Sequence, residues 1–194
     1  YLARDGKFAG RICISDTIKE DAVAALAKMK QQGVVSAMLT GDAQESAKTI
    51  AAEAGVQDVH TQLLPQDKVS CLQSIREKYG PVMFVGDGIN DAPALARADV
   101  GIAIGAGTDV AIESADIVLM RSDLLDVSTA VQLSRAVIRN IKENLFWAFF
   151  YNAIGIPIAA GVFYPAFQLK MNPMLGALAM SFSSVFVVSN ALRL

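Results

Sequence analysis

The run from Gly86 to Pro93, Gly-Asp-Gly-Ile-Asn-Asp-Ala-Pro, places Asp87, Asn90 and Asp91 in a short glycine-rich stretch. Two carboxylates this close repel each other unless a positive group stands between them. Oxygen donors of this kind suit a hard cation such as Mg2+. Asp-Gly alone is typical of an ordinary turn, but the full run favours a metal-binding loop.

Two further loops carry groups that could hold a phosphoryl group. Thr40-Gly41-Asp42 offers a hydroxyl beside a glycine N–H, and Lys68 offers a compact positive charge. Taken singly these signals are weak, because a lone lysine on a helix is usually a solvated surface group. Together with a Mg2+ site they supply what phosphoryl transfer needs.

Alternating strands and helices must position these loops. Apolar runs predict buried strands over residues 34–39, 56–60, 82–85, 100–104 and 117–120, and helical spacing predicts helices over 18–32, 43–54, 65–79 and 108–114. This order predicts the α/β class with a doubly wound parallel sheet. The three loops then fall at carboxyl ends of strands or just before a helix, where such sheets bind ligands. The alternation over residues 7–14 predicts one more strand, as an arm of a hairpin.

The composition narrows the class of protein further. The chain has 194 residues, 53% of them apolar, and a net charge of −2 without a basic cluster, which argues against nucleic acid as a partner. Cys13 and Cys71 stand far apart in apolar surroundings, so we interpret them as reduced core residues. His60 is interpreted as a surface or strand-end residue. The chain begins at Tyr1 in mid-pattern, which predicts a piece of a longer protein.

Residues 1–123 are predicted to form a cytosolic domain. After residue 123 the sequence pattern changes, and residues 124–144 predict a connecting amphipathic helix. Residues 145–163 and 171–191 are then almost free of charge. A helix that crosses a bilayer needs roughly 20 apolar residues, so both stretches predict transmembrane helices in a domain over 145–194. Two buried core helices are the alternative. Basic residues before the first stretch and Arg193 after the second predict a multi-pass protein of the cytoplasmic membrane, with both flanks cytosolic and lipid as a partner.

The three loops, read together, resemble a known family. Thr40 to Asp42, Pro65 to Lys68 and Gly86 to Pro93 resemble the phosphorylation domain of P-type ATPases, which has the haloacid-dehalogenase fold. Asp16-Thr17-Ile18-Lys19 is similar to the segment where the chain of these enzymes returns from the nucleotide domain. The resemblance implies a partial phosphorylation domain followed by two membrane helices.

The resemblance also implies a role for each matching residue. Asp87 would hold Mg2+, with support from Asn90 and Asp91, while Thr40 and Lys68 would contact the transferred phosphoryl group. ATP would be bound mainly by the nucleotide domain, and the cofactor-binding residues of this chain would be Asp16, Thr40, Gly41, Asp42 and Lys68.

This sequence departs from the family in lacking its phosphorylated aspartate, within an Asp-Lys-Thr-Gly-Thr motif. The nucleotide domain, the actuator domain and the earlier membrane helices of the family are absent too. We therefore expect the chain to be inactive alone and to have the remainder of the same pump as its partner.

The two apolar stretches contain a few polar or soft groups: Tyr151 and Asn152 in the first, and Met180, Ser183 and Ser184 in the second. Polar groups within lipid are costly and usually face a pathway, although helix–helix contacts or apolar filling would explain each one singly. A thioether suits Cu(I), whereas a divalent ion would favour carboxylate or imidazole. Both patterns resemble the copper-transporting branch of the heavy-metal ATPases, which implies Cu(I) as the transported ion and a copper chaperone as a partner.

Three alternatives stay open. The same pump could carry zinc, cadmium or silver, or the chain could be part of a membrane-anchored phosphatase of the same fold. A phosphatase would have its nucleophilic aspartate close before Tyr1, with no large insertion. A non-catalytic adaptor is the third alternative, and the intact set of Lys68, Asp87, Asn90 and Asp91 argues against it.

Overall fold

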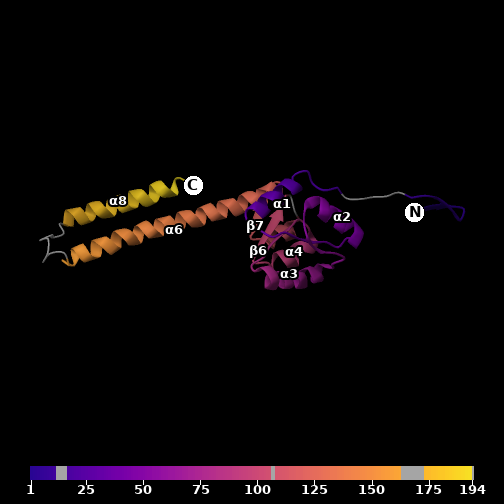
Figure 1. The fold of residues 1–194 in the computed structure, drawn as a ribbon, viewed down its shortest axis with the longest axis horizontal. Helices are drawn as coiled ribbons and strands as arrows, with labels where there is room; N and C mark the ends of the chain where they lie inside the picture. The colour runs from indigo at the N-terminus through magenta and orange to yellow at the C-terminus, as the bar shows by residue number, and fades with distance from the viewer. Residues whose placement is uncertain (12–16, 106–107, 163–172, 194) are drawn as a thin grey trace. The chain divides into compact units, whose positions relative to one another are not determined.

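The structure is a computed structural model that describes residues 1–11, 17–105, 108–162 and 173–193. The chain divides into two compact units, Tyr1–Thr129 and Ala130–Leu194. The first unit combines short strands and helices, and the second consists of the greater part of a long helix and a second helix (Figure 1).

A hairpin opens the first unit. Strands β1 (Leu2–Arg4) and β2 (Lys7–Gly10) pair antiparallel around Asp5 and Gly6, whose φ angles are 53° and 75°. An Asp-Gly pair adopts such positive φ angles readily, and the predicted hairpin is confirmed. The predicted strand over 7–14 is confirmed as far as Gly10, while residues 12–16, and with them Cys13 and Asp16, lie outside the described residues.

Two parallel sheets follow. Strands β3 (Ala37–Leu39) and β4 (Asp58–His60) form one, and β5 (Met83–Gly86), β6 (Val100–Ile104) and β7 (Ile117–Leu119) form the other in the order β5-β6-β7. The parallel α/β class is therefore confirmed. The single doubly wound sheet is confirmed only in part, because no hydrogen-bonded ladder joins the two sheets within the described ranges.

The helices of the first unit alternate with these strands: α1 (Ala22–Gln31), α2 (Gln44–Ala54), α3 (Pro65–Tyr79), α4 (Ala92–Leu95) and α5 (Asp109–Glu113). The prediction that the first helix starts at residue 18 is wrong by one turn. Lys19 Nζ donates to Ser122 Oγ at 2.6 Å, and the Asp21 carboxylate accepts from the N–H of Leu124. Both contacts hold the segment before α1 against the chain that precedes the long helix.

The core lies on both faces of the three-stranded sheet. On one face Phe84 packs with Leu72 of α3 and Leu95 of α4, and on the other face Ile102 packs with Met29 of α1. This division follows the alternation of side chains along a strand. Gly101 faces α4, and a Cβ atom there would lie 2.5 Å from the backbone oxygen of Leu95.

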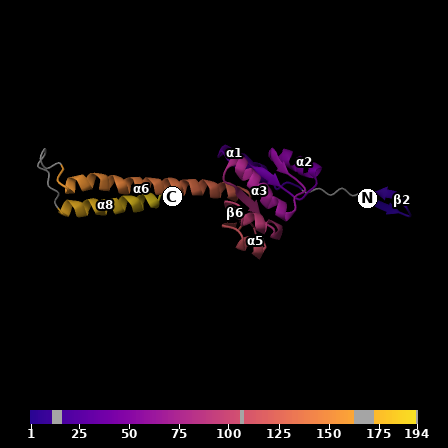
Figure 2. The ribbon, with the colours of Figure 1, turned by 90° about the horizontal axis from the view of Figure 1, so that it is seen from below.

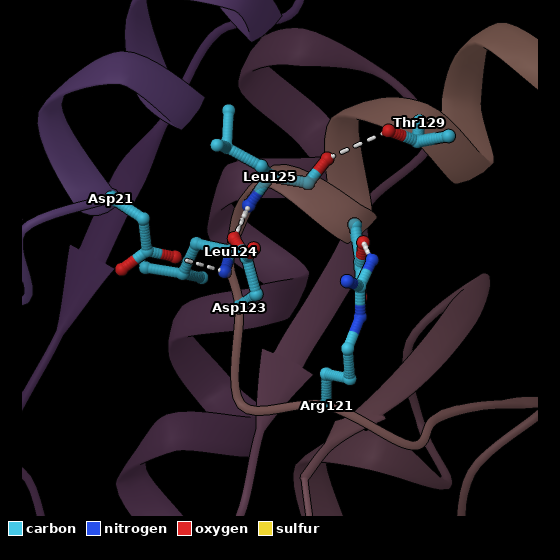
Figure 3. A network of polar contacts seen from close by, with 7 residues as sticks. Asp21, Arg121, Asp123, Leu124, Leu125 and Thr129 are labelled. Carbon is cyan, nitrogen blue, oxygen red and sulfur yellow. Dashed lines mark hydrogen bonds and ion pairs between the residues drawn. The ribbon is translucent and has the colours of Figure 1, made fainter.

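The long helix α6 (Leu125–Ala159) begins within a network of polar contacts (Figure 3). Asp123 Oδ1 accepts from the N–H of Leu125 at 2.8 Å, beside the bond from Leu124 N–H to Asp21. Arg121 donates from Nε and Nη2 to the two oxygens of Asp126 at 3.0 and 2.6 Å. N–H groups at the start of a helix have no partner in the helix itself, so the carboxylates of Asp21 and Asp123, which accept from such groups, define where α6 starts.

The first turn of α6 also belongs to the core of the first unit. Val127 and Ser128 are almost completely buried, and Val127 packs with Met29, Ile102 and Ile104. Gln32 Nε2, just after α1, donates to Ser128 Oγ at 2.9 Å. Contacts from both ends of α1 therefore hold the start of α6.

The second unit pairs α6 with α8 (Pro173–Ala191), which runs alongside it in both views (Figure 2). The helices predicted separately over 124–144 and 145–163 join in α6 without a break. Among the residues that the structure describes, no helix has both the length and the apolar character required to cross a membrane. The two stretches are thus helical over 145–159 and 173–191, but the prediction that they span a membrane is not confirmed.

Asp58, the first residue of β4, collects three neighbouring side chains. Its Oδ2 accepts from Tyr79 Oη at 2.9 Å and from Lys78 Nζ at 3.2 Å. His60 Nε2 lies 3.1 Å from its Oδ1 but is not aligned for a hydrogen bond. The hydrogen bond from Tyr79 lowers the pKa of Asp58 most; burial opposes this shift, and Lys78 adds to it.

We expect the substitution Tyr79→Phe to raise the pKa of Asp58 towards its ordinary value. A carboxyl with a lowered pKa in the folded state adds stability above the pKa of the unfolded chain, about 4, and loses it as the pH falls through the folded-state pKa. The variant should therefore have a lower free energy of unfolding than the wild type at neutral pH, and the difference should shrink in acid. NMR titration of the Asp58 carboxyl carbon tests the shift, and an unchanged titration would contradict it.

Candidate functional site

The glycine-rich loop begins where β5 ends, at Gly86, and passes through a short 3-10 turn over Ile89–Asp91 into α4. A Cβ atom on Gly86 would lie 2.8 Å from both Cβ and Oδ2 of Asp91. Only glycine leaves room for Asp91 to lie against the end of the strand. The backbone N–H of Asp91 also donates to the Gly88 oxygen at 3.0 Å, which fixes the turn.

Lys68 of α3 forms an ion pair with Asp91. Lys68 Nζ lies 2.6 Å from Asp91 Oδ1, and only 14% and 15% of the two side chains are exposed. Pro65 starts α3, and the backbone N–H of Leu64 donates to Asp67 Oδ2 at 3.0 Å. This well-defined helix start places Lys68 in the first turn, beside the glycine-rich loop.

Asp87 differs from Asp91 in its surroundings. Asp87 and Asn90 are exposed, and within the described part of the chain neither side chain makes a hydrogen bond or an ion pair. The described residues contain no cluster of three His, Cys, Asp or Glu side chains that could hold a metal ion. Mg2+ is nevertheless commonly held by one or two carboxylates with water and phosphate oxygens. The Asp87 carboxylate fits a Mg2+ ion of that kind, since its oxygens are uncommitted.

The loop Thr40-Gly41-Asp42 follows β3 directly and is closed by its own hydrogen bonds. Thr40 Oγ1 donates to Asp42 Oδ2 at 2.7 Å and accepts from the N–H of Asp42 at 3.1 Å. The Thr40 N–H donates to the His60 oxygen at 3.0 Å, and the Leu63 N–H donates to the Thr40 oxygen at 3.1 Å. The loop is therefore held against the chain after β4, and the Thr40 hydroxyl donates its hydrogen bond to the Asp42 carboxylate.

The structure brings together some of the predicted site residues. Lys68 and Asp91 are in contact, and Asp87 and Asn90 lie in the same loop as Asp91. No hydrogen bond or ion pair links residues 40–42 with residues 86–91 in the described structure. Their joint action on one phosphoryl group stays a prediction.

The predicted metal-path residues lie in the second unit. The Tyr151 ring centroid is 6.2 Å from that of Trp147 and 6.3 Å from that of Phe186, whereas Asn152 is exposed and donates to the Ala148 oxygen at 3.0 Å. Ser183 is half-buried and Ser184 is exposed. The Met180 side chain lies outside the described residues.

One polar group on the same helices was not predicted from the sequence. Asn140 and Asn144 of α6 and Asn190 of α8 form a connected set of hydrogen bonds. The spacing of Asn140 and Asn144, one turn apart on one helix face, is the signal that could have indicated it.

Comparisons with known proteins match the first half of the chain to a family model and the whole chain to individual relatives. The family model of the haloacid dehalogenase-like hydrolases matches residues 2–99. The chain is 52% identical over 194 residues to "Copper-transporting ATPase 1" of Rhizobium meliloti and 47% identical over 194 residues to "Silver exporting P-type ATPase" of Salmonella typhimurium. Each match covers 100% of this chain and 24% of the relative, so the chain spans about a quarter of these relatives' length. The crystal structure of a zinc-transporting PIB-type ATPase in the E2.Pi state superposes with a TM-score of 0.86 and 36% identity, covering 98% of this chain and 30% of that one.

Proposed function

This chain belongs to the haloacid dehalogenase-like hydrolase family, and we propose that it forms the carboxyl-terminal part of a Cu(I)-transporting P-type ATPase. In the whole pump, ATP phosphorylates an aspartate that this chain does not contain, and the chain supplies groups that surround the phosphoryl group. The match to R. meliloti "Copper-transporting ATPase 1" over all 194 residues supports this assignment.

The observation that carries the proposal is the position of Lys68. Its ammonium group is held at 2.6 Å from Asp91, in whose loop the Asp87 carboxylate is exposed and unpaired. One positive charge and one free carboxylate at the carboxyl end of a strand are what a transferred phosphoryl group with Mg2+ requires. A bound Mg2+ ion would neutralise charge on the phosphoryl oxygens.

The residues of this chain divide the work between them. Asp91 orients Lys68, whose ammonium stabilises the negative charge that the phosphoryl oxygens carry in the transition state. Asp87 would hold Mg2+, and Asn90, in the same loop, would support it. Thr40 turns its hydroxyl from Asp42 to a phosphoryl oxygen when one is present, since rotating a hydroxyl proton costs little.

We also propose that residues 145–163 and 171–191 cross the membrane, so that lipid and the remainder of the pump are the partners of the second unit. The support is the large apolar side chains that α6 and α8 expose, among them Phe146, Phe149, Ile156, Val185 and Val188. Large apolar side chains exposed in this number favour contact with a membrane or with other helices. Both flanks would be cytosolic, where a copper chaperone could reach the pump.

Cu(I) is the proposed ion because Tyr151, Asn152, Met180, Ser183 and Ser184 offer one soft sulfur and neutral oxygen and nitrogen donors. The relatives' names favour monovalent ions as well, since one is called copper-transporting and another silver-exporting. The zinc-transporting structure makes Zn2+ the competing ion to be measured.

A graft tests the proposal. We expect a chimera in which this chain replaces the matching segment of R. meliloti "Copper-transporting ATPase 1" to hydrolyse ATP when Cu(I) or Ag(I) is added. Because Met180→Leu preserves volume and usually costs less than about 1.5 kcal/mol of stability, it should lower the Cu(I) response without lowering expression. The measurement is the ATPase rate against free Cu(I), Ag(I) and Zn2+.

The controls separate the ion from the residues. A chimera that responds to Zn2+ and not to Cu(I) or Ag(I) would overturn the choice of ion. An unchanged Cu(I) response in both Met180→Leu and Asn152→Leu would remove these side chains from the ion path. Val162→Leu, at an exposed apolar position near the end of the first stretch, is the matched control and should leave the response intact.

A further inference from the structure

Three asparagines connect α6 and α8 through a closed set of hydrogen bonds. Asn190 Nδ2 donates to Asn144 Oδ1 at 2.9 Å, and Asn144 Nδ2 donates to Asn140 Oδ1 at 3.0 Å. Asn140 Nδ2 completes the ring by donating to the backbone oxygen of Asn190 at 2.8 Å. All three side chains are partly buried, so each bond is partly shielded from water.

The ring lies at a fixed distance from the predicted metal-path residues. Tyr151 follows Asn144 by seven residues, and Ser183 precedes Asn190 by seven residues. Seven residues are about two turns of a helix, or roughly 10 Å along its axis. Because the contact between Asn144 and Asn190 pairs antiparallel helices, it places Tyr151 and Ser183 at the same level.

Aromatic contacts between the ring and that level agree with this register. The Phe186 ring centroid of α8 lies 6.4 Å from that of Trp147 and 6.3 Å from that of Tyr151. Apolar and aromatic surfaces can slide past one another at small cost, because a shifted contact is also apolar. A shift of one helix turn would break both interhelical bonds, the one from Asn190 Nδ2 to Asn144 Oδ1 and the one from Asn140 Nδ2 to the Asn190 oxygen, and unpaired polar groups are costly where water is limited.

We propose that Asn140, Asn144 and Asn190 are positioning residues that fix the register of α8 against α6 and so set the ion-binding residues on the two helices opposite each other. The inference rests on the function proposed above, since it assigns the ring a purpose in ion binding. A single buried asparagine contact is a known means of specifying helix register at some cost in stability.

Disulfide formation in the full chain tests the register without any assay of transport. The background is a chain whose Cys13 and Cys71 are replaced by serine. In it, a disulfide between Ala148→Cys and Val187→Cys, two half-buried positions, reports the native register. A disulfide between Ala148→Cys and Ala191→Cys reports a shift of one turn. We expect the ratio of native to shifted cross-link to fall about threefold or more in Asn144→Leu, since one interhelical hydrogen bond within lipid contributes on average about 0.6 kcal/mol. The double variant Asn144→Leu with Asn190→Leu restores apolar packing and should show the same loss, which excludes simple unfolding as its cause.

Glu143→Gln is the matched control. It removes the charge of Glu143 and with it the neighbouring ion pair, in which Arg193 Nη2 lies 3.7 Å from Glu143 Oε2 and both side chains are exposed. Such a pair contributes little, so the cross-link ratio should stay unchanged. In the chimera, Asn144→Leu should raise the Cu(I) concentration for half-maximal stimulation about threefold or more, while phosphorylation by inorganic phosphate persists. An unchanged cross-link ratio in both asparagine variants would overturn the register proposal while leaving the pump assignment intact. A normal register in a chimera without any metal response would instead contradict the pump assignment.

Discussion

Replacing Lys68 with alanine is expected to reduce phosphoenzyme formation in the chimeric pump by about 100-fold or more. Lys68 is the cation held beside the glycine-rich loop, and its loss leaves the phosphoryl charge uncompensated. Removal of one preorganised donor to a transition state typically costs about 10²–10³ in rate. The removal also leaves the mostly buried Asp91 carboxylate without its partner, which disturbs the loop as well.

Two comparisons give this prediction its control. Asp91→Asn preserves the size of the side chain and removes its charge, so it should weaken the orientation of Lys68 and cost less than Lys68→Ala. Lys48→Ala removes an exposed lysine of α2 and should have no effect. The measurement is the amount and rate of acid-stable phosphoenzyme formed from labelled ATP. Near-normal phosphorylation of Lys68→Ala would place the phosphoryl site elsewhere.

Asp87→Asn is a useful companion to these variants because we propose that Asp87 holds Mg2+. It removes one ligand charge without removing the loop, so the Mg2+ concentration for half-maximal phosphorylation should rise. Lys68→Ala should lower the maximal rate at saturating Mg2+ instead. The two roles are thus separable in one titration.

The second large effect concerns stability: Gly101→Ala should lower the free energy of unfolding by about 3 kcal/mol, at the upper end of the cost of overpacking. The added Cβ would lie 2.5 Å from the backbone oxygen of Leu95 and 3.0 Å from its carbonyl carbon. Both atoms belong to the backbone of a helix packed on the sheet, so they cannot move aside as a flexible side chain would. Relief requires α4 to lift from β6, which opens the packing of Leu95 and Phe84.

Denaturant unfolding of the full chain in detergent, followed by circular dichroism, measures this loss. Gly10→Ala is the matched control, because a Cβ atom on Gly10 would meet no atom within 4 Å. We expect its free energy of unfolding to stay within about 0.5 kcal/mol of the wild-type value, as for most surface substitutions. Equal midpoints for Gly101→Ala and the wild type would show that α4 does not pack on β6 as described.

The sequence predicted helix ends best where a proline opens the helix or a glycine ends it. The helix predicted over 65–79 matches α3 because Pro65 opens it and Gly80, with a φ of 95°, ends it. The start of α1 could not be predicted in this way. It depends on bonds from Lys19 to Ser122 and from Asp21 to Leu124, each across 103 residues of sequence.

The candidate site was predicted to a similar extent. The glycine-rich loop and the Thr40 loop follow β5 and β3 as expected from apolar runs that end in glycine and aspartate. The contact of Lys68 with Asp91 was not predictable, because it depends on how α3 packs beside the loop. The Asn140 ring was missed for the same reason, since its third member comes from another helix.

The burial of Val127 and Ser128 has a consequence for the order in which the protein folds during synthesis. Domains generally fold as units as the chain emerges from the ribosome. The core face that contains Met29 and Ile102 is complete only when Val127 has emerged, and the bond from Gln32 to Ser128 closes a loop of 96 residues. The apolar stretch that starts at Leu145 follows shortly afterwards. Closure of the α/β core would therefore fall close in time to the membrane insertion that we propose for the next segment.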